Sequence, residues 1–289
     1  ASVKLDRLLQ LALLVSFYGR DLWRDHGNVA RQRARYARLF EQCALAIAEG
    51  PVARRRLIEL GCPEAKARIH PLGIDLTRLP YADRPMSRTV RVLAAARFTE
   101  KKGLAYGIEA FCRAAAEEAG LQLTVVGDAK KSSAQQQIKA RLHGLVEASG
   151  MSARVCFAGK VPPDELRRLL YDHDVLLQPS VRAADGDAEG GLPVILLEAA
   201  ASGMPLIGSR HCDIPEIVVE GQTGWLCEER DISGLTAALL SAARDPVQRA
   251  QFGRNARKRV EQRFDINQHS WDALYREALA RGPQYSGLD

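Results

Sequence analysis

Residues 91–104 read Arg-Val-Leu-Ala-Ala-Ala-Arg-Phe-Thr-Glu-Lys-Lys-Gly-Leu. A short apolar run ends at Arg97, and a cationic loop with Lys101 and Lys102 precedes a helical pattern that opens at Gly103. This order predicts a strand, a basic loop and a helix. Ligands of open α/β sheets bind outside the carboxyl ends of the strands, so Arg97 and Lys102 are predicted to lie at a binding edge. An arginine fork and a lysine point charge together suit a diphosphate, whereas Lys101 is expected to be a solvated charge.

The same alternation continues along the chain. Apolar strand-like runs alternate with helical stretches, which implies parallel strands joined by right-handed crossovers. The sequence therefore predicts a doubly wound, Rossmann-like α/β domain. The runs lie at 90–96, 121–127, 154–158, 174–178 and 205–208, and the helices between them at 103–119, 133–149, 163–172 and 192–202. Further helices are expected near 214–220, 232–244, 246–263 and 266–280.

The first 80 residues are less regular. A buried strand is predicted at 11–17, and Tyr36, Leu39, Phe40, Cys43 and Ile47 fall on one helical face, although 45–48 also fits a short strand. A helix at 51–60 ends at Gly61, and a strand follows at 69–74. These elements are too few for a parallel sheet of their own. With a polar linker at 82–89, we expect a partial first domain (1–82), a complete α/β domain (83–264) and a C-terminal helix (265–289) that crosses back.

Composition excludes several protein classes. The chain has 289 residues, 46% hydrophobic and 26% charged, as in an ordinary globular protein. No apolar run reaches the roughly 18 residues of a membrane-spanning helix. The six cysteines form no C-x-x-C pair and no metal-binding spacing, so a reduced cytoplasmic location is predicted and no metal site is expected.

The positive charge lies in the first segment. Residues 1–80 hold 14 Lys/Arg and 8 Asp/Glu, a net of +6, whereas residues 81–289 hold 27 of each. Arginines 31, 33, 35 and 38 share one predicted helix, and arginines 54, 55 and 56 another. Such a basic face binds nucleic acid, anionic membrane or an acidic ligand, or is only solvated. No motif typical of nucleic-acid binding is present, so nucleic acid is not an expected partner.

A second candidate site is Glu-Gly-Gly-Leu-Pro-Val-Ile-Leu-Leu-Glu at 189–198. Pro193 suits the first turn of a helix, and Gly190 and Gly191 are expected to leave N–H groups bare at its positive end, where phosphate or sugar oxygens bind. Glu189 and Glu198 could then hold the hydroxyls of a sugar and of a ribose. The alternative is an ordinary loop with a surface acid. His211, beside Cys212, is either a further contact or structural.

These stretches, taken in order, resemble a known family. The resemblance covers nearly the whole chain and rests on order and spacing rather than on any one motif. The chain resembles glycosyltransferases of family 4, which have the two-domain GT-B architecture, and within them bacterial enzymes that build exopolysaccharide or lipopolysaccharide, of the colanic-acid type. The stretches are 16–21 (SFYGRD), 61–63 (GCP), 73–75 (GID), 97–103 (RFTEKKG), 126–128 (VGD), 155–159 (VCFAG), 178–180 (QPS), 189–198, 202–205 (SGMP) and 213–216 (DIPE).

The resemblance implies a function. It implies retaining transfer of a hexosyl group from a nucleotide-diphosphate-sugar to a glycan or lipid-linked acceptor, without metal or other cofactor. Arg97 and Lys102 would clamp the diphosphate, Glu189 would orient the donor sugar and Glu198 would bind the ribose. The remaining donor-binding residues would be Gly159, Lys160 and Val161 at the nucleobase, and Gly190, Gly191 and Leu192 at the phosphate and sugar.

Two departures from the family pattern bear on this expectation. Eight residues, not the usual seven, separate Glu189 from Glu198, so the extra glycine is expected to re-aim Glu189. Only the last part of the family's first, acceptor-side domain is recognised. The alternative function is therefore a truncated, inactive module that binds nucleotide-sugar. If the acceptor is lipid-linked, the basic segment is expected to rest on the inner face of an anionic cytoplasmic membrane.

Overall fold

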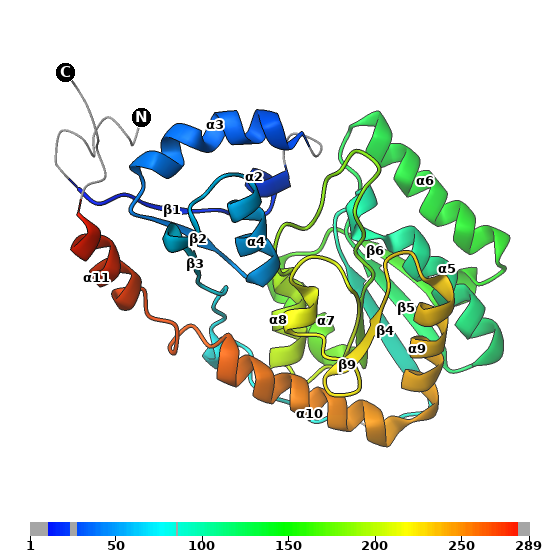
Figure 1. Cartoon of the computed structure of the whole chain (residues 1–289). Coiled ribbons are helices and arrows are strands. Elements are labelled where there is room, and N and C mark those ends of the chain that lie inside the picture. The colour runs from blue at the N-terminus through cyan, green and yellow to red at the C-terminus, as the bar shows by residue number, and fades with distance from the viewer. Residues whose placement is uncertain (1–10, 24–27, 85, 283–289) are drawn as a thin grey trace.

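The computed structural model describes residues 11–23, 28–84 and 86–282, which form two parallel β-sheets (Figure 1). The larger sheet has the order β6-β5-β4-β7-β8-β9, and all of its strand pairs are parallel. This is the predicted doubly wound order. Its strands are β4 (Val90–Ala95), β5 (Leu121–Val126), β6 (Val155–Gly159), β7 (Val175–Gln178), β8 (Leu206–Ser209) and β9 (Gly224–Cys227).

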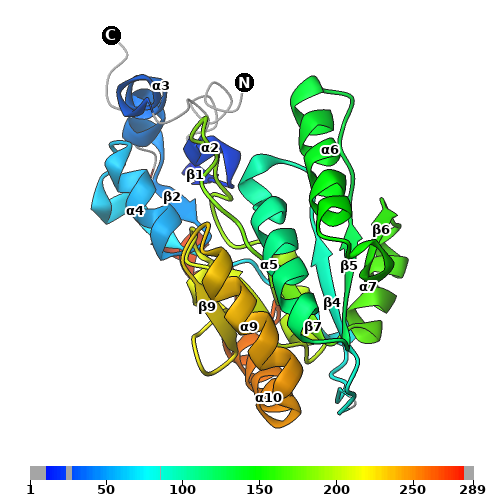
Figure 2. The same cartoon turned by 90° about the vertical axis from the view of Figure 1, so that its right-hand side faces the viewer.

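Helices cover both faces of this sheet (Figures 1 and 2). One face packs on α5 (Leu104–Glu117) and α9 (Ile232–Arg244), with α6 (Ser133–Ala148) beside α5. The other packs on α7 (Pro163–Asp172), α8 (Val194–Ala201) and α10 (Pro246–Arg263). Strands buried on both faces explain the continuous apolar runs in the sequence.

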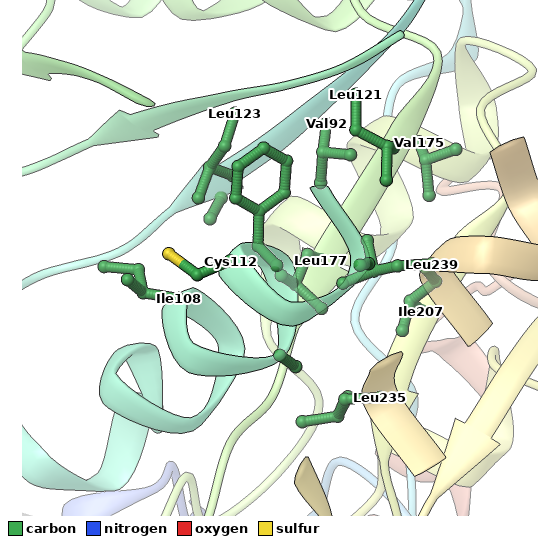
Figure 3. Close-up of a cluster of buried hydrophobic side chains, with 14 of the residues drawn as sticks. Val92, Ile108, Cys112, Leu121, Leu123, Val175, Leu177, Ile207, Leu235 and Leu239 are labelled. Atoms are coloured by element: carbon green, nitrogen blue, oxygen red, sulfur yellow. The ribbon is translucent and has the colours of Figure 1, made fainter. Parts of the chain in front are cut away.

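Successive residues of one strand enter different cores. Val92 of β4 packs toward α5 and α9, whereas its neighbour Leu93 packs with α8. Figure 3 shows the first core, where side chains from β4, β5, β7 and β8 meet those of α5 and α9. The sheet therefore holds its loops between two packed layers.

The smaller sheet has the order β1-β2-β3, again parallel, so the expectation that the first 80 residues offer too few strands for a parallel sheet of their own was wrong. Its strands are β1 (Leu14–Ser16), β2 (Leu45–Ala48) and β3 (Ala67–Ile69), and its helices are α2 (Arg20–Trp23), α3 (Val29–Gln42) and α4 (Pro51–Glu59). All four residues of the central strand β2 are buried. The carboxyl ends of these strands lead into loops that face the larger sheet's binding edge.

The chain passes twice between the sheets. The two passages are hydrogen-bonded: Ile74 N–H donates to Phe264 O (2.7 Å) and Ile266 N–H donates to Ile74 O (3.1 Å). Beyond the second passage, α11 (Asp272–Arg281) lies beside the smaller sheet (Figure 1). Arg68 of β3 donates two hydrogen bonds to Glu277 of α11, at 2.6 and 3.1 Å, and this paired geometry fixes the helix against the strand.

Some predicted elements differ in extent. The helix predicted to reach Ile47 ends at Gln42, because Cys43 is extended and 45–48 pairs as β2 between two strands. The strand predicted at 69–74 lies at Ala67–Ile69, and Pro71, which lacks an N–H, cannot extend the ladder. The helix predicted from 266 begins at Asp272.

The sequence did not predict β9, the strand at one edge of the larger sheet. The helix predicted at 214–220 is only a 3₁₀ turn at Ile214–Glu216, and β9 follows it. This strand has four residues and begins with Gly224, whose backbone lies so close to Leu206 that a Cβ would fall 1.8 Å from the Leu206 carbonyl oxygen. So short a strand, opened by glycine, has little periodicity. Within the described residues, no helix combines the length and apolar character that crossing a membrane requires.

The packing of this core predicts how much a large-to-small substitution destabilises the fold. Leu123→Ala removes a side chain that is 1% exposed in the core of Figure 3, and we expect the free energy of unfolding to fall by about 2–5 kcal/mol. Leu279→Ala is the matched control, because that leucine is 70% exposed on α11. Urea unfolding measures both. Equal costs for the two variants would contradict the assigned core.

Candidate functional site

A cavity of about 650 Å³ lies at the carboxyl edge of the larger sheet, against the loops of the smaller one. It sits where neighbouring strands β4 and β7 lead to helices on opposite faces, the position at which doubly wound sheets bind ligands. Both sheets contribute to its wall. The lining residues used below are Tyr18, Gly19, Trp23, Glu49, Arg97, Lys101, Lys130, Asp187, Glu189, Gly191 and Leu192.

The loops after β4 and β7 touch directly. Gly103, at φ +62°, passes so close to the β7 loop that a Cβ would fall 1.7 Å from Pro179 O. Val181 N–H also donates to Lys101 O at 2.9 Å. Only glycine tolerates both the left-handed backbone and this approach, so Gly103 fixes the register of the two loops.

Glu189 and Lys102 form a buried ion pair. Lys102 Nζ lies 2.7 Å from Glu189 Oε2, and the Glu189 side chain is only 6% exposed. Ser180 Oγ donates to the other carboxylate oxygen at 2.6 Å. A buried carboxylate needs such partners, because an unpaired charge is strongly disfavoured there. The structure thus brings together two of the predicted site residues, 87 positions apart in the chain.

The backbone of Glu189 is also anchored. Its N–H donates to Nε2 of His211 at 3.1 Å, and His211 Nδ1 lies 2.6 Å from Glu229 Oε1. Burial lowers the pKa of His211, while Glu229 acts in the opposite direction, so we assign the neutral ring with its proton on Nδ1. The ring connects Glu229 to the Glu189 loop. Of the two roles weighed for His211, this contact is the structural one.

Arg97 and Lys101 differ in their environments. Arg97 is exposed in the cavity, and its guanidinium makes no hydrogen bond or ion pair within the described part of the chain. Lys101, expected to be solvated, is instead buried: its ammonium lies 3.1 Å from Asp187 and donates to Ala188 O at 2.8 Å. Lys101 therefore holds the β7 loop, whereas Arg97 and Lys130 are exposed cations in the cavity lining.

The glycine-rich turn before α8 has partners that the sequence did not predict. Gly190 N–H, expected to be bare, donates to Cys212 Sγ at 3.4 Å, and the carboxyl group of Glu49 lies against Gly191, close to the Leu192 N–H. Burial raises the pKa of the Cys212 thiol to about 12, so the sulfur remains a neutral acceptor. Pro193, predicted in the first turn, is instead the N-cap. Two N–H groups of the turn therefore have an acceptor group of the protein close by before any ligand binds.

Of the predicted donor-binding residues, Arg97, Gly191 and Leu192 line the cavity, whereas Lys102 and Gly190 are not part of its lining. Four further ones, Glu198, Gly159, Lys160 and Val161, also lie outside it. Glu198 falls in the second turn of α8, as predicted, where burial raises its pKa and Arg167 of α7 acts against that rise. Gly159 ends β6 at φ +68°, and Lys160 beyond it is exposed. Val161 packs in the core below α8. All four lie at or beyond the sheet's carboxyl edge, but the structure does not bring them into contact with Glu189.

Sequence reasoning missed the part of the wall that comes from the smaller sheet. Glu49 directly follows β2, and Tyr18 follows β1, so both occupy the carboxyl ends of parallel strands. The alternative strand at 45–48 is confirmed as β2, and the position of Glu49 directly after it is the signal that could have found this residue. Trp23 also lines the cavity, with the Arg56 and Arg182 guanidinium groups 4.7 and 4.3 Å from its ring centroid.

A carboxylate from the larger sheet caps a helix of the smaller one. Asp213 accepts hydrogen bonds from Val52 N–H (2.8 Å) and Ala53 N–H (3.3 Å) at the start of α4. These N–H groups have no partner within the helix, and a negative charge at this end is favourable. The sheets are therefore joined beside the cavity as well as through their linkers.

The basic residues of the first segment divide into two groups. Arg56 is buried and donates to Leu22 O and Gln32, so it is structural. Arginines 31, 33, 35 and 38 of α3 are all exposed. Fewer arginines are therefore exposed on this basic face than the sequence indicated. Among the residues placed by the structure, no three His, Cys, Asp or Glu side chains are grouped as a metal site would require.

With this geometry in hand, comparison with known proteins identifies the class. Residues 86–259 match the family model described as "Glycosyl transferases group 1". The chain belongs to this family of glycosyltransferases. The fold agrees: a chain of Anabaena Alr3699/HepE, solved with UDP and glucose, matches with a TM-score of 0.80 at 19% identity, over 96% of this chain and 74% of that one. The architecture is therefore that of GT-B glycosyltransferases.

Two bacterial relatives are more similar in sequence. The amylovoran biosynthesis glycosyltransferase AmsK of Erwinia amylovora is 34% identical over 91% of this chain and 62% of its own length. The putative colanic acid biosynthesis glycosyltransferase WcaL of Escherichia coli K12 is 34% identical over 80% of this chain and 55% of its own length. The chain thus spans less than two thirds of each.

The anchoring of Glu189 can be tested by mutation. His211→Phe leaves the Glu189 N–H without its acceptor and Glu229 without its partner, so we expect a loss of about 1–3 kcal/mol in the free energy of unfolding. His143→Phe is the control, because that ring stacks on Phe157 at the surface. Urea unfolding would show it unchanged within about 0.5 kcal/mol. An unchanged midpoint for His211→Phe would rule out the anchoring role.

Proposed function

We propose that this chain is the donor-binding part of a retaining glycosyltransferase that moves a hexosyl group from a nucleotide-diphosphate-sugar to a glycan or lipid-linked acceptor in bacterial polysaccharide biosynthesis. The observation that carries the proposal is the cavity where Arg97, the Lys102–Glu189 pair and the turn before α8 converge. The names of AmsK and WcaL, which refer to amylovoran and colanic acid, support the polysaccharide assignment. The neighbour solved with UDP supports a nucleotide donor.

In this proposal each site residue has a role. Arg97, which has no partner in the ligand-free site, binds the diphosphate bidentately, and Lys102 supplies a second positive charge. Glu189, held by Lys102 and Ser180, orients the donor sugar. Glu198 binds the ribose. The residues left for the nucleobase are Gly159, Lys160 and Val161, and those left for the phosphate and sugar are Gly190, Gly191 and Leu192.

The chemistry requires stabilisation of the leaving diphosphate. As the bond from the sugar to the diphosphate breaks, negative charge grows on the phosphate oxygens. Arg97, Lys102 and the positive end of α8 are already placed at this edge, so they need little reorganisation when the charge develops. We therefore propose transfer without a metal ion.

The alternative function is a module that binds nucleotide-sugar without turnover. It predicts donor binding but no transfer to any acceptor. The relatives bear the names of transferases, which favours the enzyme.

Donor binding is the first test. UDP, GDP, ADP and their common sugar conjugates should be screened by thermal unfolding, because a ligand that binds only the folded state raises the midpoint. We expect one nucleotide to raise it by several degrees, and Arg97→Ala or Glu198→Ala to abolish the shift. Arg113→Ala is the control, since that arginine is exposed on α5 and pairs with Glu109. The absence of a shift with every nucleotide would refute the proposal.

We also propose that the protein is cytoplasmic and that it binds the surface of an anionic membrane through the exposed arginines of α3. Each basic residue near such a surface contributes about 1 kcal/mol, so Arg31, Arg35 and Arg38, spaced i, i+4 and i+7 on α3, favour binding at low salt, whereas Arg33 donates to Glu59 O at 2.6 Å. Co-sedimentation with anionic vesicles should then exceed that with neutral ones, and fall when arginines 31, 33, 35 and 38 are replaced by glutamine. Equal binding to both vesicles would contradict membrane contact.

A further inference from the structure

Glu49 connects the smaller sheet to the donor side of the cavity. It follows β2 and precedes α4, and it lines the same cavity as Arg97 and Glu189. Its carboxyl group lies against the turn before α8: a Cβ on Gly191 would fall 1.9 Å from Glu49 Oε2, and the Leu192 N–H is close to the same carboxyl group. The additional glycine between the paired glutamates therefore makes room for this carboxyl group.

This position is one that an anion would take. N–H groups at the start of a helix, with the positive end of its dipole behind them, bind phosphate. In the structure, Glu49 Oε2 lies against Gly191 of this turn, close to the N–H of Leu192. A donor diphosphate at this turn would therefore lie beside Glu49, and two negative charges there would repel each other.

The surroundings already disfavour a charge on Glu49. Burial is the main cause, and Asp213, which is also buried, adds repulsion; together they raise the pKa of Glu49 to about 7. Among the residues that the structure describes, no positively charged side chain forms a hydrogen bond or an ion pair with the Glu49 carboxyl group. The other charged groups facing the two cavities that it lines are Arg97, Lys101, Lys130, Asp185, Asp187 and Glu189 in the larger, and Glu216 and Arg263 in the smaller.

We propose that Glu49 is a proton-linked donor-binding residue, whose carboxyl group takes up a proton when a nucleotide-sugar diphosphate binds at the turn before α8. The proposal rests on the proposed function and adds a residue from the opposite sheet to that site. In the protonated form Glu49 has an O–H that can donate to a phosphate or sugar oxygen. In the ionised form it repels the diphosphate.

The direction of the pH effect follows. Below the pKa of the free protein Glu49 is neutral and costs the donor nothing. Above it, binding must first protonate the carboxyl group, so affinity falls as pH rises. Between pH 6.5 and 8.5 we expect the dissociation constant of the unmodified chain to rise by roughly tenfold or more.

Isothermal titration calorimetry tests this. The probe is whichever of UDP-glucose, GDP-mannose or ADP-glucose binds, since their diphosphates keep a constant charge over this range. Titration in two buffers of different ionisation enthalpy gives the number of protons taken up. We expect proton uptake near pH 7.5 for the unmodified chain, and none for Glu49→Gln, which keeps an acceptor for Leu192 N–H but cannot ionise. The affinity of Glu49→Gln should be nearly constant with pH.

Asp213→Asn provides a matched control. It leaves Glu49 in place and removes the nearby repulsive charge, so the fall in affinity should begin at a lower pH. Persistence of the proton uptake in Glu49→Gln would overturn the proposal. So would pH-independent binding by the unmodified chain, a result that needs no variant and leaves the proposed function standing. Failure of the unmodified chain to bind any of the three probes would overturn both.

Discussion

The site depends on the adjacency of β4 and β7. These strands are neighbours in the sheet but far apart in the chain, and their connections leave toward opposite faces. A space therefore opens at their carboxyl ends, and the loops that follow them must meet there. Gly103 permits the contact with Pro179 that sets their spacing. Lys102 and Glu189 can pair because these two loops are in register.

The carboxyl groups around the cavity differ in how far neighbouring groups compensate their negative charge. Glu189 is buried beside Lys102, so its ionised form is compensated. Asp213 is compensated by the N–H groups of α4. Glu49 is half-buried near Asp213 and has no positively charged partner among the described residues, so burial and the repulsion from Asp213 raise its pKa to about 7. Arg97 and Lys130, both exposed in the cavity lining, are cations that this arrangement leaves to a ligand.

The two sheets are also joined through side chains of the site region. Asp213 and His211 lie on one loop after β8: the first caps α4 of the smaller sheet, and the second anchors the Glu189 backbone. A displacement of the smaller sheet would therefore also displace the turn before α8, which Glu49 contacts as well. On the far side, α11 is fixed to β3 by Arg68 and Glu277. The cavity wall is thus built from both sheets at once.

The sequence by itself determined the doubly wound fold, because buried parallel strands require continuous apolar runs and their helices require a 3.6-residue period. It also placed Arg97 and Lys102 at the carboxyl edge and Glu189 in a loop before a helix, since a loop that leads from a strand to a helix starts at the carboxyl end of that strand. It did not resolve β2 or β9, because four buried residues have no periodicity to separate strand from helix. Only the tertiary structure decided which groups are paired: Lys101 with Asp187, Gly190 with Cys212, and Leu192 with Glu49. These contacts join residues from separate loops, and the position of one loop relative to another is set by packing between elements rather than by the local pattern of either.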